Sequence, residues 1–178
     1  MQTLIHDLLT FPRVGRQEDA ITNNDCNVVL EQALKNLQGA IQECGAVVEC
    51  GRLPTVMANG SQLQQVLQNL IGNAIKFRGA EKPLIQVKAE AEVDQWVFTV
   101  SDNGIGVPVA NRQDIFVIFK RLHTRTEYSG NGIGLSICKK IVERHGGKIW
   151  IEPAAGSGSS FRFTLPRENP LSMKDAAR

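Results

Sequence analysis

The feature that most constrains the fold is a helix containing two asparagines, followed along the chain by three glycine-rich turns. The segments are QVLQNLIGNAIKF from Gln65, SDNGIG from Ser101, GNGIGL from Gly130 and GSGSSF from Gly156. Any one of them alone says little, because an Asp-Asn-Gly sequence is most often an ordinary turn. Together and in this order they outline a nucleotide pocket, for which ATP with a metal ion is the expected ligand.

The helix predicted from Gln62 to Phe77 has two distinct faces. At 100° per residue, Asn69, Asn73 and Lys76 fall together, about 110° away from an apolar stripe. Amide oxygens are hard ligands suited to Mg²⁺, and a lysine supplies a point charge for phosphate oxygens. For this helix alone, a solvated polar face is an equally good interpretation, although asparagine in mid-helix is unfavourable. The apolar stripe comprises Leu63, Val66, Leu67, Leu70, Ile71, Ala74 and Phe77.

The glycine turns carry complementary chemistry. Asp102 ends a predicted strand, where its carboxylate can accept the exocyclic amine of adenine, and Gly104 and Gly106 allow backbone to approach a flat ring. Glycines at 130, 132 and 134 directly precede a helix, so that backbone N–H groups and the helix dipole can face an anion. The dinucleotide fingerprint is excluded, because Leu135 stands where its third glycine should be.

The pattern of apolar residues predicts one main domain at residues 26–167. Residues 1–12 are predicted to be the end of a longer helix, residues 13–25 a polar linker, and residues 168–178 a disordered tail or linker. Val107–Asn131 has no sustained period and is predicted to be a functional loop or lid. Further helices are expected from Val29 and from Ile133, the latter closed by Gly146-Gly147, and strands at 46–49, 55–58, 85–100 (a hairpin with one buried face), 148–152 and 160–165.

Composition narrows the class of protein. The net charge of +2 and the lack of a basic run argue against nucleic-acid binding. The four cysteines form no C-x-x-C pair, so reduced thiols in a cytoplasmic protein are expected. No apolar stretch approaches the length of a membrane span, so no membrane contact is expected of this fragment, although a longer parent chain could be anchored.

The ordered motifs resemble the catalytic ATP-binding domain of sensor histidine kinases, over roughly Cys26 to Pro166. The matching motifs are the asparagine helix, Asp102-x-Gly104-x-Gly106, the segment IFVIFKR from Ile115, Gly130-x-Gly132-x-Gly134-Leu135, and Gly156-x-Gly158-Ser159-x-Phe161. The stretch RLHTRTEYSGNGIGLSICKKIVERHGGKIW is most similar to the phytochrome-like and PAS-coupled branch. The resemblance implies a two-layer α/β sandwich of the Bergerat type, with a mixed, mostly antiparallel sheet packed against helices.

The resemblance also implies roles for particular residues. Asn73 would be the magnesium ligand, Asn69 a second polar contact, Lys76 a phosphate contact and Asp102 the partner of adenine. The remaining implied positions are Gly104, Gly106 and Ser159 on the adenine side, Gly132, Gly134 and Leu135 in the phosphate loop, Phe116 and Phe119 as lid anchors, and Arg121, His123 or Arg125 reaching the γ-phosphate. Implied partners are the phosphoacceptor hairpin of the same kinase and a response-regulator receiver domain, in a full-length homodimer.

No residue of this chain is predicted to be the acceptor histidine. His6 stands in the nearest imitation of the acceptor motif, but two helices cannot fit between it and Cys26. His145, before Gly146-Gly147, is interpreted as a helix-terminal residue favoured by the dipole. Two alternative functions stay open: an ATP-hydrolysing relative of gyrase and mismatch-repair proteins, which would need a glutamate base where Asn69 stands, and a non-catalytic nucleotide-binding module.

Overall fold

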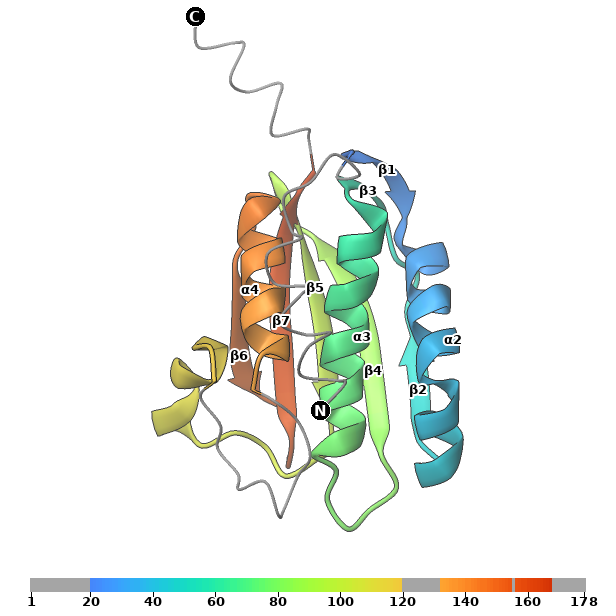
Figure 1. Cartoon of the computed structure of the whole chain (residues 1–178), viewed down its shortest axis with the longest axis vertical. Coiled ribbons are helices and arrows are strands. Elements are labelled where there is room, and N and C mark those ends of the chain that lie inside the picture. The colour runs from blue at the N-terminus through green and yellow to red at the C-terminus, as the bar shows by residue number, and fades with distance from the viewer. Residues whose placement is uncertain (1–19, 120–131, 155, 168–178) are drawn as a thin grey trace, which may run out of the picture.

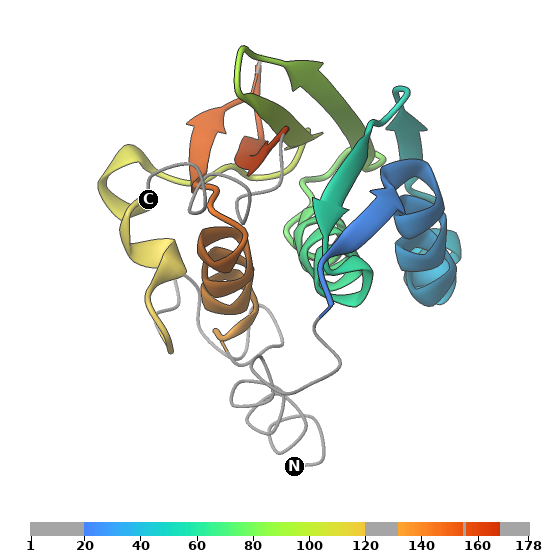
Figure 2. The same ribbon diagram turned by 90° about the horizontal axis from the view of Figure 1, so that it is seen from above.

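The computed structural model describes residues 20–119, 132–154 and 156–167, and these form two layers. Within this part of the chain, five strands make a sheet in the order β2-β4-β5-β7-β6, and three helices lie on one of its faces (Figures 1 and 2). Only the β2–β4 pair is parallel. The elements are α2 (Cys26–Cys44), β2 (Val47–Cys50), α3 (Gly60–Lys76), β4 (Leu84–Ala91), β5 (Gln95–Asp102), α4 (Gly134–Arg144), β6 (Ile149–Pro153) and β7 (Ser159–Pro166). The predicted sandwich, with its mixed and mostly antiparallel sheet, is confirmed.

A separate two-stranded ribbon lies beyond the main sheet. Strand β1 (Thr22–Asp25) pairs antiparallel with β3 (Thr55–Ala58), and Asp25 then caps α2 by accepting the Asn27 N–H at 2.8 Å. The polar linker predicted at residues 13–25 thus contains a strand at residues 22–25 that was not predicted. The sequence does not indicate this strand, because its four residues, TNND, are polar and mostly exposed, and its partner strand is distant in the sequence.

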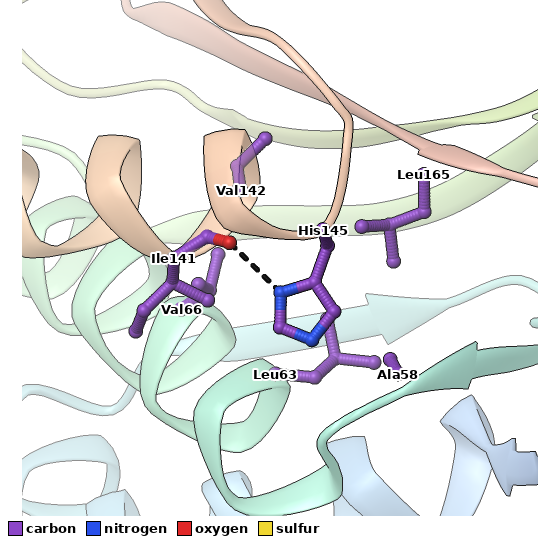
Figure 3. Close-up of a pocket in the computed structure, with 7 residues that line it drawn as sticks. All are labelled: Ala58, Leu63, Val66, Ile141, Val142, His145 and Leu165. Carbon is purple, nitrogen blue, oxygen red and sulfur yellow. Dashed lines mark hydrogen bonds between the residues drawn. The ribbon is translucent and has the colours of Figure 1, made fainter. Parts of the chain in front are cut away.

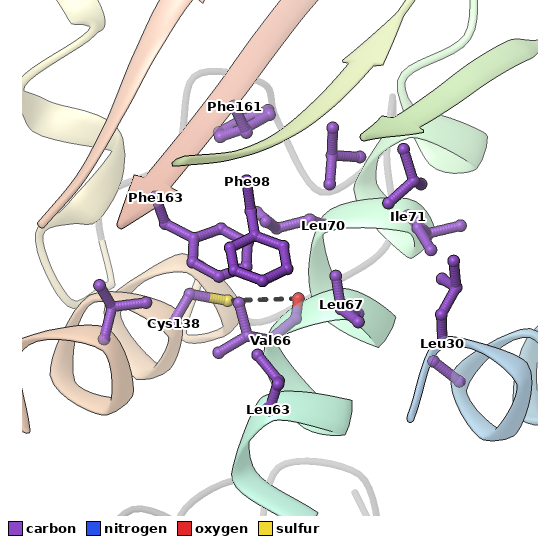
Figure 4. Packing of buried hydrophobic residues seen from close by; sticks show 14 of the residues in the cluster. Leu30, Leu63, Val66, Leu67, Leu70, Ile71, Phe98, Cys138, Phe161 and Phe163 are labelled. Atoms are coloured by element: carbon purple, nitrogen blue, oxygen red, sulfur yellow. Dashed lines mark hydrogen bonds between the residues drawn. The ribbon is translucent and has the colours of Figure 1, made fainter. Parts of the chain in front are cut away.

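The core lies between the helices and the sheet. Phe98 of β5 and Phe163 of β7 stack with ring centroids 4.8 Å apart, and the apolar stripe of α3 packs against them (Figure 4). The stripe predicted for α3 is buried except for Phe77, which is half-buried as the C-cap of the helix. This packing holds α3 beneath the centre of the sheet with its polar face turned sideways, toward α4.

The hairpin of β4 and β5 differs from the prediction of one buried face. In β4 the alternation is clear, but in β5 Val97 and Thr99 are buried on the far face as well. Strand β5 is central, and Arg162 of β7 stands directly opposite Thr99. The Arg162 guanidinium lies 5.7 Å from the ring centroid of Trp150 and 3.2 Å from the Glu152 carboxylate. We infer that this side-chain layer covers the far face of the sheet at β5.

Two short 3-10 helices occur in the segment predicted to be a loop or lid. They span Val109–Asn111 and Asp114–Phe116, and Ile115 of the second is buried against the core. The first part of this segment is therefore more regular than the missing period suggested. The rest of it, residues 120–131, lies outside the described residues.

Candidate functional site

Helices α3 and α4 run antiparallel, so that the end of α3 meets the start of α4. Asn59 caps α3 by accepting the Gln62 N–H at 2.9 Å, which fixes where the helix begins and hence which residues face α4. The Asn69 side-chain amide lies 3.5 Å from the Gly134 carbonyl at the first turn of α4. Asn69 thus borders the start of α4, next to the glycine loop, as its predicted role requires.

Asn73 and Lys76 lie one and two turns further along α3. Both are half-buried, and Lys76 Nζ is 4.6 Å from the centroid of the Phe77 ring. An amide and an ammonium group on one helix face, beside the N-terminus of a second helix, suit an anion together with a hard cation. Among the described residues, no three His, Cys, Asp or Glu side chains cluster to hold a metal ion, so the oxygen donors available here are amides.

Asp102 lies where β5 ends and holds two backbone segments together. Its Oδ1 accepts the Gly104 N–H at 2.8 Å and the Ser159 N–H at 3.2 Å. Both of these bonds use Oδ1, so that Oδ2 is the oxygen placed to accept a further donor. The structure therefore brings together Asp102, Gly104 and Ser159, three of the residues predicted for the adenine side. Ser159 contributes its backbone N–H here.

Burial raises the pKa of the Asp102 carboxyl above its ordinary value, and the hydrogen bonds from Gly104 and Ser159 oppose this effect only in part. The folded protein therefore pays a free-energy cost to keep this carboxylate charged. A carboxyl group whose pKa is shifted by burial is often found in a binding site.

The glycines of this region are needed first for the fold. A Cβ on Gly104 would lie 2.4 Å from the Phe77 carbonyl oxygen, at the C-terminal end of α3. Gly158 has φ +107°, and a Cβ there would lie 2.0 Å from the Asp102 carbonyl oxygen. Gly104 thus allows two protein segments to approach each other closely, and the approach of backbone to a ring at this position stays a prediction. The close approaches at Phe77 and Gly158 therefore hold α3, β5 and the last glycine turn together. The predicted site included neither of these two residues.

The phosphate-loop residues lie at the start of α4. The Phe119 N–H donates to the Gly132 carbonyl at 3.1 Å, and Phe119 itself has φ +63°, a conformation that is uncommon for a bulky residue. This bond joins Phe119 of the IFVIFKR segment to the glycine loop. Phe116 and Leu135 are partly buried and pack against the core.

Several predicted residues cannot be placed. Arg121, His123 and Arg125, together with Gly130 and His6, lie outside the described residues. Their predicted roles therefore stay predictions.

His145 has a partner that the sequence did not reveal. Its ring is buried, Nε2 accepts the Asn59 backbone N–H at 2.9 Å, and Nδ1 lies 2.8 Å from the Ile141 carbonyl oxygen. The sequence interpretation, a residue at the end of a helix, accounts for the contact with Ile141 of the same helix but not for the contact with Asn59. The first contact connects the C-cap of α4 to the N-cap of α3, 86 positions earlier in the chain.

Comparison with known proteins identifies the family. The sequence model of the "Histidine kinase-, DNA gyrase B-, and HSP90-like ATPase" family matches residues 58–169. The chain belongs to this ATPase family. The match begins at the end of β3 and includes the asparagine face of α3 and all three glycine-rich turns, the one after Asp102 among them.

Within this ATPase family, the named relatives are histidine kinases and phytochromes. "Phytochrome-like protein Cph1" of Synechocystis sp. is 51% identical over 169 residues, which is 95% of this chain and 23% of that protein. "Cyanobacterial phytochrome A" of Nostoc sp. is 51% identical over 166 residues, 93% of this chain and 22% of that protein. "Adaptive-response sensory kinase SasA" of Prochlorococcus marinus is 47% identical over 116 residues, 64% of this chain and 30% of that protein. The chain thus spans about a quarter of the length of the first two.

Solved structures of histidine kinases share the fold. The nucleotide-free catalytic domain of histidine kinase ThkA superposes with a TM-score of 0.72 at 30% identity, covering 83% of this chain and 95% of that domain. Full-length ShkA in complex with AMPPNP gives a TM-score of 0.78 at 29% identity, covering 94% of this chain and 36% of that protein. ThkA in complex with the response regulator TrrA gives 0.74 at 25% identity, covering 94% and 48%.

The described helices and two buried cysteines complete the description of the chain. None of the helices in residues 20–119, 132–154 and 156–167 is long and apolar enough to cross a membrane. Burial raises the pKa of the Cys26 and Cys138 thiols to about 12, so that both stay protonated and unreactive at neutral pH.

Proposed function

We propose that this chain binds ATP with Mg²⁺ and positions the nucleotide for phosphoryl transfer to a histidine of a dimerising hairpin in the parent protein. The parent would be a cytoplasmic or membrane-anchored sensor kinase, homodimeric at full length, that passes the phosphoryl group to a receiver domain. The named relatives that are histidine kinases, and the ThkA structure in complex with a response regulator, support this reading.

The observation that carries the proposal is a pair of polar groups, one at the end of β5 and one on α3. These two elements meet where the Ile105 N–H donates to the Phe77 carbonyl. Asp102, with Oδ1 bonded to Gly104 and Ser159, offers an oxygen acceptor at the end of β5. The amide of Asn69 meets the first turn of α4, with Asn73 beyond it on the same face of α3. A ligand that contacts both groups needs an amine donor for Asp102 and an anion for the face of α3 that carries Asn69 and Asn73. Adenine and a polyphosphate provide these two groups.

The residues present suit a magnesium ion. Asn73 would supply a hard oxygen ligand, and Asn69 a second contact to the metal, a water molecule or phosphate. When bound, the ion would neutralise phosphate charge, which is the main requirement of phosphoryl transfer. Lys76 and the backbone N–H groups near Gly132 and Gly134 would hold the phosphate oxygens in line with the attacking imidazole.

Some of the residues expected to contact the ligand lie outside the described part of the chain. We propose that Gly106 and Ser159 line the adenine side, that Leu135 and Phe119 flank the phosphates, and that Arg121 and His123 approach the γ-phosphate. Domain limits of 26–167 for the catalytic unit are proposed with them, extended at the N-terminus by β1.

An amide at position 69 argues against a hydrolase of the gyrase type. Activation of water needs a base, and the Asn69 amide cannot take a proton. It also bonds the Gly134 carbonyl, a donor role that a carboxylate could not play. Transfer to a histidine, which is itself the nucleophile, needs no such base.

Calorimetric titration tests the proposal. ATP should bind in the presence of Mg²⁺ and more weakly after the metal is removed with a chelator, whereas adenosine should bind with an affinity that the chelator does not change. Equal binding of ATP and GTP, or ATP binding that ignores the chelator, would contradict the proposed site.

A further inference from the structure

We propose that His145 is a positioning residue for the phosphate half of the site, acting through Asn59, the N-cap of α3. The inference rests on the proposed function and adds a residue that lies at the opposite end of both helices from the phosphates.

The His145 ring is held at both nitrogens. The Asn59 N–H faces Nε2, so this nitrogen carries the lone pair, and Nδ1 donates its hydrogen to the Ile141 carbonyl. The ring is only 4% exposed and sits among apolar side chains (Figure 3). The cavity beside it has a volume of about 10 Å³, space for one water at most, and is lined by Ala58, Leu63, Val66, Ile141, Val142, His145 and Leu165.

Three of the polar contacts between α3 and α4 follow one another in reverse order along the two helices. Asn59 meets His145 at 2.9 Å, the Val66 carbonyl meets the Cys138 thiol at 3.9 Å, and the Asn69 amide meets the Gly134 carbonyl at 3.5 Å. The last two lie at the outer limit of hydrogen-bond length, and one uses a weak thiol donor. The bond at His145 is therefore the strongest polar constraint among these contacts on how far α4 can slide or turn against α3.

The consequence falls on the phosphate half of the site. Asn73 and Lys76 belong to α3, whereas the loop around Gly132 leads directly into α4. If α4 shifts, the two sets of phosphate contacts separate. The adenine side would be spared, because Asp102 and Ser159 belong to β5 and β7 and are held by their own hydrogen bonds.

The experiment compares the affinities of the 178-residue chain for ATP with Mg²⁺ and for adenosine, by calorimetry, well below the unfolding temperature. In His145→Leu the Asn59 N–H loses its acceptor. We expect adenosine affinity to change less than about twofold and the ATP-to-adenosine affinity ratio to fall about tenfold, the size of one lost hydrogen bond's effect. His145→Gln, whose amide oxygen can accept the Asn59 N–H, should keep the ratio within about threefold of wild type.

A matched control separates positioning from general stability. Val142→Ala removes core methyl groups from the same helix without touching the His145 bonds, and it should lower the unfolding temperature while keeping the ratio. An unchanged ratio in His145→Leu, or an equal fall in Val142→Ala, would overturn the inference. A wild-type chain that bound neither ligand would overturn the proposed function, and the inference with it.

A second pair of variants serves if His145→Leu does not fold. Asn59 has φ −80°, which proline can adopt, so Asn59→Pro removes the N–H that faces His145. Asn59→Ala loses the same capping side chain but keeps the N–H. The ratio should be lower in Asn59→Pro than in Asn59→Ala, and equal ratios would refute the positioning role.

Discussion

Replacing Asp102 with asparagine should weaken ATP binding without weakening the fold. The asparagine oxygen can still accept the Gly104 and Ser159 N–H groups, which leaves its NH₂ group facing the position of Oδ2. Two donors, this NH₂ and the adenine amine, would then meet. Loss of a hydrogen bond to a charged group is worth roughly 1.5–3 kcal/mol, so the affinity for ATP should fall about 10- to 150-fold.

The sign of the effect on stability follows from the pKa shift. The Asp102 pKa is raised by burial, so the favourable contribution of its neutral form is present in acid and is lost as pH rises through the folded-state pKa. At neutral pH the buried charge costs stability, and Asp102→Asn, which removes it, should have an unfolding temperature equal to or above that of wild type. A ligand site often carries such a cost.

The assay combines calorimetry with ATP and GTP and thermal unfolding of both proteins. The affinity for GTP relative to that for ATP should rise in Asp102→Asn, because the guanine oxygen can accept a hydrogen bond from the new NH₂ group. As pH falls toward the raised pKa, ATP affinity of the wild type should fall and that of the variant should not. An ATP affinity within about twofold of wild type, or a clearly lower unfolding temperature, would refute the reasoning.

Three further predictions concern other parts of the chain. Gly104→Ala should lower the free energy of unfolding by about 1–3 kcal/mol, because the new Cβ would meet the Phe77 carbonyl, and denaturant titration measures this loss. The matched control is Gly39→Ala, at a position of α2 where nothing lies within 4 Å of the new Cβ. It should raise the free energy of unfolding by roughly 0.5–1 kcal/mol. A lower free energy of unfolding in Gly39→Ala, or an unchanged one in Gly104→Ala, would contradict the packing argument. Amide exchange in residues 107–131 should slow when a non-hydrolysable ATP analogue binds; protection equal to that of the core strands with and without the analogue would exclude a lid.

The sequence predicted the elements whose patterns are local, and it failed where the partner is remote. The two faces of α3 follow from 3.6-residue periodicity within one segment, so the buried stripe and the polar face could be predicted correctly. Strand β1 could not, because four polar residues become a strand only by pairing with β3. Val97 and Thr99 stand opposite Thr164 and Arg162 of β7, so their burial depends on a strand that is remote in the sequence.

The candidate site shows the same division. Asp102 and the glycine turns could be recognised as chemistry-bearing from the order of the motifs, but the reason that Gly104 must be glycine lies in the Phe77 carbonyl of a different element. His145 next to two glycines reads as the end of a helix. Only the folded chain shows that its second nitrogen is bonded to Asn59.

Phosphoryl transfer from γ-labelled ATP tests the central claim most directly. The chain is incubated with Mg²⁺ and labelled ATP, alone and with a separately supplied phosphoacceptor hairpin of a histidine kinase. We expect acid-labile label on the hairpin alone, at a rate that rises with hairpin concentration because the reaction is bimolecular. Transfer should be lost in Asn73→Asp and kept in His6→Gln. Acid-labile label on the isolated chain that disappears in His6→Gln, or label release only as free phosphate, would contradict the account.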